Sequence, residues 1–332
     1  MNQSGQYKLA PLFSLTGIAA MEFCENTLFS QSKIIGLADL RDANTVAVLS
    51  ERAGTIFSDA VKKIKDVLAD DMVGIAAVDI PLLYPNDKTV DAIAGALLAV
   101  SIAQHVMPSL LDRENGTPFS IFNASQKNSR TLDSVGIKGV SPTDILDFHS
   151  DGSIHDGLLS IPKYLFLYNI LINYHNKGNF YWVPTQTITG IKEYIDSFGE
   201  RDDYIFDLTP TVYESQPSQI KAILAHRART SIFRRVGENS IATFMNGTFR
   251  GKHDDIDGAA IEILAQFRTD ISQNDCRYYV PQQARRMIFL RNDCGFHARD
   301  VLDNPIEGLA TTRSYLRSAS VEGHPVGYIE AG

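Results

Sequence analysis

Phe148-His149-Ser150-Asp151-Gly152-Ser153-Ile154-His155-Asp156-Gly157 is the stretch around which the sequence is organised. It places an imidazole at His149 and a carboxylate at Asp151, two residues apart. Because side chains i and i+2 of a strand point to the same face, these two groups can reach one metal ion. If the strand continues, His155 lies on that face too and could contact a substrate or support a ligand, although a polar loop histidine is an equally good interpretation.

A third metal ligand is found far along the chain, at His297 in Asn292-Asp-Cys-Gly-Phe-His-Ala-Arg299. Two imidazoles and one carboxylate that occupy one face of an octahedron leave three positions open, which is the arrangement of non-haem Fe(II) oxygenases. We therefore expect His149, Asp151 and His297 to converge on one ion.

The chain contains a second His-x-Asp triplet, His253-Asp254-Asp255. Its acids stand just ahead of a helical pattern at Ala259–Phe267, where Asp side chains accept hydrogen bonds from exposed helical amides. We interpret this copy as a capping loop and the copy at 149–151 as the metal site.

The overall composition is that of an ordinary soluble globular protein of 332 residues, with 44% hydrophobic and 21% charged residues. A net charge of −8 and the absence of a basic cluster disfavour a nucleic-acid partner. The three cysteines, at unrelated spacings, suggest neither disulfides nor a zinc site. No signal peptide is apparent, and Ala92–Val106 is too interrupted to span a membrane, so we expect a cytoplasmic protein. The expected partner is a small-molecule substrate. The sequence does not indicate the oligomeric state.

The first third of the chain is predicted to be mainly helical. Ser50–Leu68 has apolar residues at helical spacing and predicts one amphipathic helix. Val73–Pro81 is a continuous apolar run of strand length, and Asp91–Leu111 predicts a long buried helix.

From Pro118 onward the pattern changes to short strands separated by polar turns. Strands are expected at 119–122, 128–131, 144–149, 276–281 and 284–290, and a short helix at 190–198. Two aromatic and β-branched runs around His175–Gly178 predict a hairpin. Residues 200–257 are polar and irregular, with a helical pattern at Ser218–Arg229, and an insertion of this kind is typical of an active-site lid. We expect one domain over 1–332, of α/β (α+β) class: helical support at 1–115, a β core at 118–199 and 258–320, and a lid at 200–257.

The last predicted strand, Thr311–Ser320, carries two arginines on one face. Strand alternation places Arg313, Tyr315 and Arg317 together. A guanidinium matches a carboxylate with two parallel hydrogen bonds, so Arg313 beside a metal would suit a dicarboxylic co-substrate. The alternative is that both arginines face solvent.

At this point the sequence resembles a known family, the clavaminate synthase-like, or TauD-like, iron(II)/2-oxoglutarate dioxygenases. The resemblance covers the C-terminal two-thirds of the chain, in order and spacing, and is carried by 148–155, 161–167, 287–292, 295–299 and 312–317. It implies a double-stranded β-helix (jelly-roll) core. It departs from the amino-acid oxygenases of that family in one ligand, since Asp151 stands where Glu is common there.

The resemblance also implies roles for individual residues. His149, Asp151 and His297 would bind Fe(II), with 2-oxoglutarate and O2 as co-substrates. Arg313 would hold the distal carboxylate of 2-oxoglutarate, and Arg317 the α-carboxylate of the substrate. The implied activity is hydroxylation of an unactivated C–H bond in a small polar substrate, most simply a free amino acid or a derivative.

Two other classes of protein remain open from the sequence. A zinc-dependent hydrolase could use the same three ligands and a bound water, although no His-Glu-x-x-His helix supports it. A non-catalytic β-sandwich binding module, with incidental histidines, is the second. Metal content and the dependence of turnover on O2 separate these classes.

Overall fold

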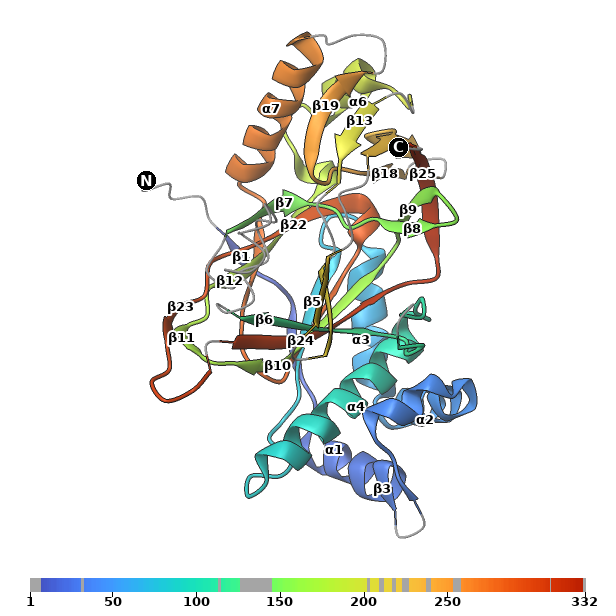
Figure 1. The fold of residues 1–332 in the computed structure, drawn as a ribbon, viewed down its shortest axis with the longest axis vertical. Coiled ribbons are helices and arrows are strands. Elements are labelled where there is room, and N and C mark those ends of the chain that lie inside the picture. The colour runs from blue at the N-terminus through green and yellow to red at the C-terminus, as the bar shows by residue number, and fades with distance from the viewer. Residues whose placement is uncertain are drawn as a thin grey trace.

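The computed structural model describes residues 7–30, 33–112, 115–125, 145–201, 204–208, 212–216, 219–222, 227–236, 240–252, 258–310 and 312–330. The first helices of the chain gather at one end of the molecule, and sheets occupy its middle (Figure 1). Helices α6 (Ile191–Phe198) and α7 (Gly258–Gln273) lie at the opposite end (Figure 1). Both agree with the helices expected from the sequence.

The described N-terminal residues form the helices α1 (Gly17–Phe23), α2 (Ala43–Ile56), α3 (Ser58–Ala69) and α4 (Lys88–Val106), with a π-helical turn at Cys24–Leu28 and a 3-10 turn at Leu37–Arg41. The prediction of a single helix over Ser50–Leu68 is wrong, because the chain breaks at Phe57. Phe57 leaves helical geometry (φ −108°, ψ 29°) and packs its buried ring against Phe23, with ring centroids 6.0 Å apart.

The long apolar helix predicted near Asp91–Leu111 is confirmed as α4. Asp87 caps its first turn by accepting hydrogen bonds from the amides of Thr89 and Val90. By length and composition alone, α4 is long and apolar enough to cross a membrane. It nevertheless packs against α2, α3 and a core strand, and most of it is buried, as in the core helix of a soluble protein.

A six-stranded sheet, which we call the central sheet, lies against these helices. Its strand order is β2 (Leu12–Ser14), β5 (Ile75–Asp79), β21 (Arg286–Leu290), β10 (Leu165–Ile172), β24 (Thr312–Ala319), β6 (Ser120–Ser125). β2 runs parallel to β5, and the remaining pairs are antiparallel. The strands expected at 73–81, 119–122, 284–290 and 311–320 are therefore confirmed.

A five-stranded sheet, which we call the site sheet, packs on the other face of the central sheet. Its order is β1 (Lys8–Leu9), β20 (Tyr278–Pro281), β12 (Asn179–Pro184), β22 (Gly295–Arg299), β7 (Leu146–His149). The strand predicted at Asp144–His149 is confirmed for its described residues. The β-like run expected at 128–131 lies outside the described residues.

The strands β5, β21 and β10 of the central sheet are buried on both faces, which explains why they read as nearly continuous apolar runs. In β5, Ala76 and Val78 face the helices, whereas Ile75 and Ala77 face the site sheet. The same alternation holds in β10 and β21, and Trp182 of β12 closes the layer between the two sheets. The two sheets thus form a sandwich that is covered by α1–α4 on its outer side.

A third sheet, the outer sheet, has the order β19 (Thr248–Lys252), β13 (Tyr204–Asp207), β16 (Arg227–Thr230), β25 (Gly323–Ile329), β9 (Leu158–Pro162), β8 (Ser153–His155). Its core includes Phe267 of α7 and Phe296 of β22. Two-stranded ribbons complete the described β structure: β3 (Phe29–Ser30) with β4 (Lys33–Ile34), β11 (Tyr174–Asn176) with β23 (Asp303–Pro305), β14 (Val212–Gln216) with β15 (Gln219–Ala222), and β17 (Phe233–Arg235) with β18 (Ile241–Thr243).

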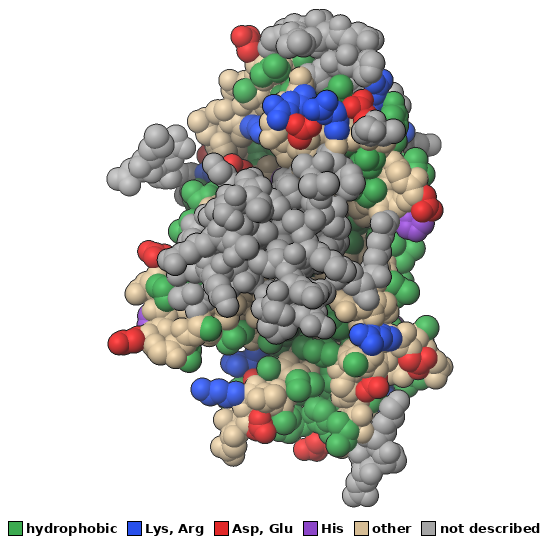
Figure 2. Space-filling model, viewed as in Figure 1, with side chains coloured by type: hydrophobic (Ala, Val, Ile, Leu, Met, Phe, Trp, Pro, Cys, Tyr) green, Lys and Arg blue, Asp and Glu red, His purple; other side chains and the backbone are tan. Residues whose placement is uncertain are grey.

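Residues 200–257 contribute strands to this outer sheet, and the helix predicted over Ser218–Arg229 is wrong. The described part of that range forms β15 and β16. β16 pairs with β13 on one side and β25 on the other, so backbone pairing overrides its local helical pattern. Basic and acidic side chains mix on the face shown in Figure 2. In this region the single carboxylate of Asp207 forms ion pairs with both Arg227 and Arg250.

The hairpin predicted around His175–Gly178 is also wrong. Both runs are strands, but β10 belongs to the central sheet and β12 to the site sheet. Between them, β11 pairs with β23 instead. The connection therefore crosses from one layer of the sandwich to the other, a choice that the alternation of residues in the two runs does not reveal.

A packing constraint between α4 and β10 yields a test of this fold. A Cβ at Gly95 would collide with the buried hydroxyl of Tyr168. Alanine is preferred over glycine inside a helix by about 1 kcal/mol, whereas overpacking a core costs about 1–3 kcal/mol. We expect Gly95→Ala to lower the free energy of unfolding, measured by denaturant titration.

The double variant Gly95→Ala/Tyr168→Phe should recover that loss, because the collision is with the hydroxyl. Recovery would fail if the helix packed against β10 in a different register.

Candidate metal centre

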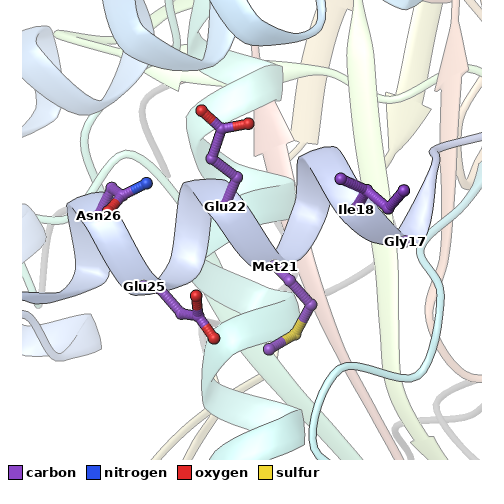
Figure 3. A pocket seen from close by; sticks show the side chains of 6 residues that line it. All are labelled: Gly17, Ile18, Met21, Glu22, Glu25 and Asn26. Atoms are coloured by element: carbon purple, nitrogen blue, oxygen red, sulfur yellow. The ribbon is translucent and has the colours of Figure 1, made fainter.

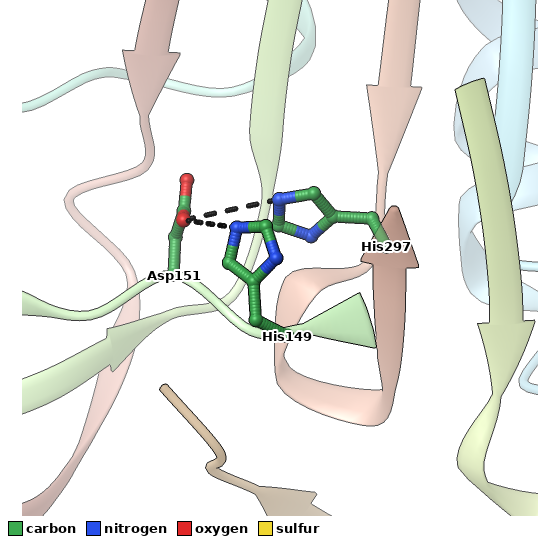
Figure 4. A group of neighbouring side chains, drawn as sticks. All are labelled: His149, Asp151 and His297. Carbon is green, nitrogen blue, oxygen red and sulfur yellow. Dashed lines mark ion pairs between the residues drawn. The ribbon is translucent and has the colours of Figure 1, made fainter. Parts of the chain in front are cut away.

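The pairing of β7 with β22 brings together two histidines that are far apart in sequence. In this antiparallel pair His149 lies directly opposite His297, and their ring centroids are 4.2 Å apart. Asp151 follows in the loop after β7 and turns its carboxylate toward both rings (Figure 4). The structure thus brings together the three ligands expected from the sequence.

The geometry of the three side chains suits a single metal ion. Asp151 Oδ1 lies 3.4 Å from His149 Nε2 and 3.8 Å from His297 Nε2, and one ligand atom from each residue lies within 4.8 Å of the others. Two ligand atoms bound about 2.0–2.2 Å from one ion lie at most about 4.4 Å apart, so the carboxylate oxygen and either imidazole nitrogen are within reach of a single ion. Two nitrogens and one carboxylate oxygen on one side of an ion leave its other side open for exchangeable ligands.

The two imidazoles are held in the state that a metal requires. His149 Nδ1 lies 2.7 Å from the carbonyl oxygen of Asp147; donation of its proton there leaves Nε2 free to bind a metal. His297 is buried under the ring of Phe180, with centroids 5.5 Å apart. Burial, together with the neighbouring His149 and Arg317, lowers the pKa of His297 to about 3, so its imidazole is neutral at physiological pH.

The carboxylate of Asp151 divides its two oxygens between different partners. Oδ1 faces the histidines, whereas Oδ2 accepts hydrogen bonds from Nε (2.8 Å) and Nη2 (2.6 Å) of Arg317. Burial acts to raise the pKa of Asp151, but the Arg317 guanidinium and the two imidazoles outweigh it and hold the pKa well below its usual range. Asp151 is thus ionised and presents one oxygen to a metal.

Two residues to which the sequence assigned no role fix the backbone of this loop. The side chain of Asn292, fully buried, accepts a hydrogen bond from the Asp151 amide (2.8 Å) and donates to the Asp151 carbonyl (2.8 Å). Ser150 points the opposite way: its amide donates to the Met245 carbonyl, its Oγ accepts from the Met245 amide, and Asn246 donates to the Ser150 carbonyl. Asn292 stands between Arg291 and Asp293, just after an apolar strand, and this context gives no sequence signal for such a role.

Arg313 lies on the face of β24 that points into the sandwich, as alternation predicts. It is 5% exposed, its Nε donates to Asn169 Oδ1 (2.9 Å), and its guanidinium carbon lies 4.1 Å from the ring centre of Tyr315. Burial and the nearby Arg299 lower the pKa of Arg313 to about 10, whereas Tyr315 raises it. Among the described residues Arg313 forms no ion pair. Because buried charges are normally paired, its guanidinium could bind an anionic ligand.

His155 is not part of this group. The strand does not persist through Ser150–Gly152, and His155 ends β8 on the surface, with its side chain 78% exposed and paired with Asp156 at 3.0 Å. The second His-x-Asp triplet, at 253–255, lies outside the described residues.

A hollow elsewhere on the molecule contains none of these residues. It is open to solvent and lies along α1 and the following π-helical turn (Figure 3). Its lining consists of Gly17, Ile18, Met21, Glu22, Glu25 and Asn26. The candidate site is therefore the group at His149, Asp151 and His297.

Comparisons with known proteins support the fold behind this site. No protein-family model and no curated protein matches the chain. A solved structure of an asparagine oxygenase in complex with Fe(II), 2S,3S-3-hydroxyasparagine and succinate is similar, with a TM-score of 0.66 and 12% identity over 93% of each chain.

Structures of the non-heme iron oxygenase OrfP are similar as well. The complex with Fe and alpha-ketoglutaric acid has a TM-score of 0.64 and 13% identity over 94% of this chain and 93% of that one. The complex with Fe and L-Arg has a TM-score of 0.62 and 14% identity over 94% of each chain. The chain shares the mixed α/β, sheet-rich fold of these oxygenases, along nearly its whole length.

The hydrogen bonds of Asn292 predict its effect on metal binding. Asn292→Ala should weaken the binding of a divalent metal about 10–100-fold, because the Asp151 backbone loses its support. Isothermal titration of the apoprotein measures this. Asn274→Ala is the control, since Asn274 is also buried and donates to a backbone carbonyl, that of Thr187, outside the metal centre. Equal losses in both variants would contradict the assigned role.

Proposed function

We propose that the chain is an iron(II)- and 2-oxoglutarate-dependent oxygenase that hydroxylates a free amino acid or a close derivative. The observation that carries this proposal is the convergence of His149, Asp151 and His297, with Asp151 presenting one oxygen only. A zinc hydrolase could share the three ligands, but the similar fold of the solved iron oxygenases favours iron at this site.

Each residue of the site has a task in this proposal. Iron bound there, with 2-oxoglutarate and O2, supplies the oxidising power for C–H hydroxylation, while 2-oxoglutarate is converted to succinate and CO2. The two imidazoles and the Asp151 carboxylate hold the metal and leave three adjacent positions for exchange. Arg313 binds the distal carboxylate of 2-oxoglutarate, because it is a buried cation without an ion pair among the described residues.

Arg317 is our candidate for recognising the α-carboxylate of the substrate. Nε and Nη2 both contact Asp151 Oδ2, which places the guanidinium beside the metal and on the same strand face as Arg313. An amino acid whose carboxylate lies against Arg317 would have its side-chain carbons near the metal. The solved complexes with 3-hydroxyasparagine and with (3S)-hydroxy-L-Arg support this substrate class.

The finer organisation of the chain follows from the same proposal. We infer that the central and site sheets form a double-stranded β-helix core within a single domain, and that residues 200–257 cover the site. The hydrogen bonds between Ser150 and residues 245–246 support a lid role, because they tie that segment to the loop between two metal ligands. A cytoplasmic location stays our expectation, and the described cysteines are all unpaired.

The proposal is tested by adding Fe(II) and 2-oxoglutarate to the apoprotein without O2. We expect a visible charge-transfer absorption band, and, with O2, succinate formation that one member of a panel of amino acids stimulates. His297→Ala should abolish the band because it removes a ligand. His175→Ala is the control, since His175 is exposed on β11.

A protein that gives no band, or that turns over a substrate with zinc and without O2, would overturn the proposal. Loss of the band in both histidine variants would show that it does not arise from the proposed centre.

A further inference from the structure

The guanidinium of Arg313 has two edges that could bind a carboxylate. One edge consists of Nε and one terminal nitrogen, and the other of the two terminal nitrogens, Nη1 and Nη2. The first edge is already engaged, because Nε donates to Asn169 Oδ1 at 2.9 Å. Only the terminal edge is then available for a bidentate contact with a ligand.

Asn169 supplies this contact from the neighbouring strand. It lies on β10 directly opposite Tyr315 of β24, next to an irregularity in the pairing between Asn169 and Leu171, and it is 1% exposed. Its Nδ2 is buried without a hydrogen-bond partner among the described residues. A ligand oxygen bound beside Arg313 would satisfy this donor, whereas an apolar ligand would leave it unpaired.

Tyr315 fixes the plane of the same guanidinium. The guanidinium carbon lies 4.1 Å from the centre of the Tyr315 ring, and that ring stacks on Phe122 of β6 with centroids 5.2 Å apart and an interplanar angle of 14°. Two adjacent strands, β6 and β24, thus contribute to the stack, and a third, β10, contributes Asn169. The stack restricts rotation of Arg313, and the hydrogen bond that Arg313 donates to Asn169 sets which edge faces inward.

The charge of the partner matters as much as its position. Asn169 orients the guanidinium with a neutral oxygen, so the positive charge of Arg313 is not neutralised. An aspartate at this position would form an ion pair in a buried setting and leave little attraction for an anionic ligand. Arg299, the other cation whose charge acts on Arg313, adds to the positive potential.

We propose that Asn169 and Tyr315 are positioning residues that present the terminal edge of Arg313 and so select a dicarboxylic over a monocarboxylic 2-oxo acid. This inference rests on the proposed function. It assigns the preference for a dicarboxylate to two residues that do not bind the metal. The 2-oxo acid end of either ligand binds at the metal and is indifferent to both residues.

The test compares two ligands of equal chain length in anaerobic titrations of the Fe(II) protein: 2-oxoglutarate, and 2-oxopentanoate, which lacks the distal carboxylate. The dissociation constant of each comes from the absorption band, without turnover. Asn169→Asp should raise the dissociation constant of 2-oxoglutarate at least about tenfold and leave that of 2-oxopentanoate nearly unchanged. Asn123→Asp makes the same charge change at an exposed site on β6, where Ser314 donates to Asn123, and should alter neither.

A second pair of variants decides the matter if Asn169→Asp does not fold. Tyr315→Phe keeps an aromatic ring under the guanidinium and should retain the preference for 2-oxoglutarate, whereas Tyr315→Leu should lose most of it. If the preference for 2-oxoglutarate over 2-oxopentanoate were unchanged in Asn169→Asp, or equal in the two Tyr315 variants, this inference would be overturned and the proposed function would still stand. If the unmodified protein gave no band with 2-oxoglutarate, the proposed function would fall first.

Discussion

The antiparallel pairing of β7 with β22 is the contact on which the site depends. It places His149 opposite His297 although 148 residues separate them in sequence, by the difference of their numbers. A slip of one residue would turn one imidazole to the other face of the sheet and leave no pair of ligands. The sandwich supplies the rigidity for this register, because β22 is paired on its other side with β12, whose Trp182 is buried between the sheets.

Around this pair the site is arranged by charge. His297 is held neutral, Asp151 carries the negative charge, and Arg317 of the opposite sheet binds the oxygen of Asp151 that faces away from the histidines. Arg317 therefore joins the two sheets at the metal centre. Arg313, four residues earlier on β24, forms no ion pair with a described carboxylate, and this difference between the two arginines underlies the proposal that Arg313 receives the distal carboxylate of 2-oxoglutarate.

Much of the site could be predicted from the sequence, because it is built from local spacing. His149 and Asp151 are two residues apart, and Arg313 and Arg317 lie on one strand face, so alternation alone relates each pair. His297 could be proposed as the partner from ligand chemistry. Asn292 and Asn169 could not, because their roles depend on contacts between segments more than 100 residues apart, which no local pattern encodes.

The errors in the predicted fold have the same origin. The runs around His175–Gly178 look like a hairpin, since each is a good strand, but which sheet a strand joins is set by packing on its two faces. A continuous strand would place His155 beside the metal ligands, but the chain leaves β structure after His149, and His155 lies on the surface. Local propensity identifies strands more reliably than it identifies their partners.

The central claim is that His149, Asp151 and His297 bind one face of a metal ion. Arg313, on the facing sheet, is proposed to bind the distal carboxylate of 2-oxoglutarate. A crystal structure of the protein with Fe(II) and 2-oxoglutarate, grown without O2, tests it most directly. We predict a metal about 2.0–2.2 Å from His149 Nε2, His297 Nε2 and one Asp151 oxygen, with the distal carboxylate of 2-oxoglutarate on the terminal nitrogens of Arg313. A metal bound without His297, or a co-substrate carboxylate held elsewhere, would contradict the claim.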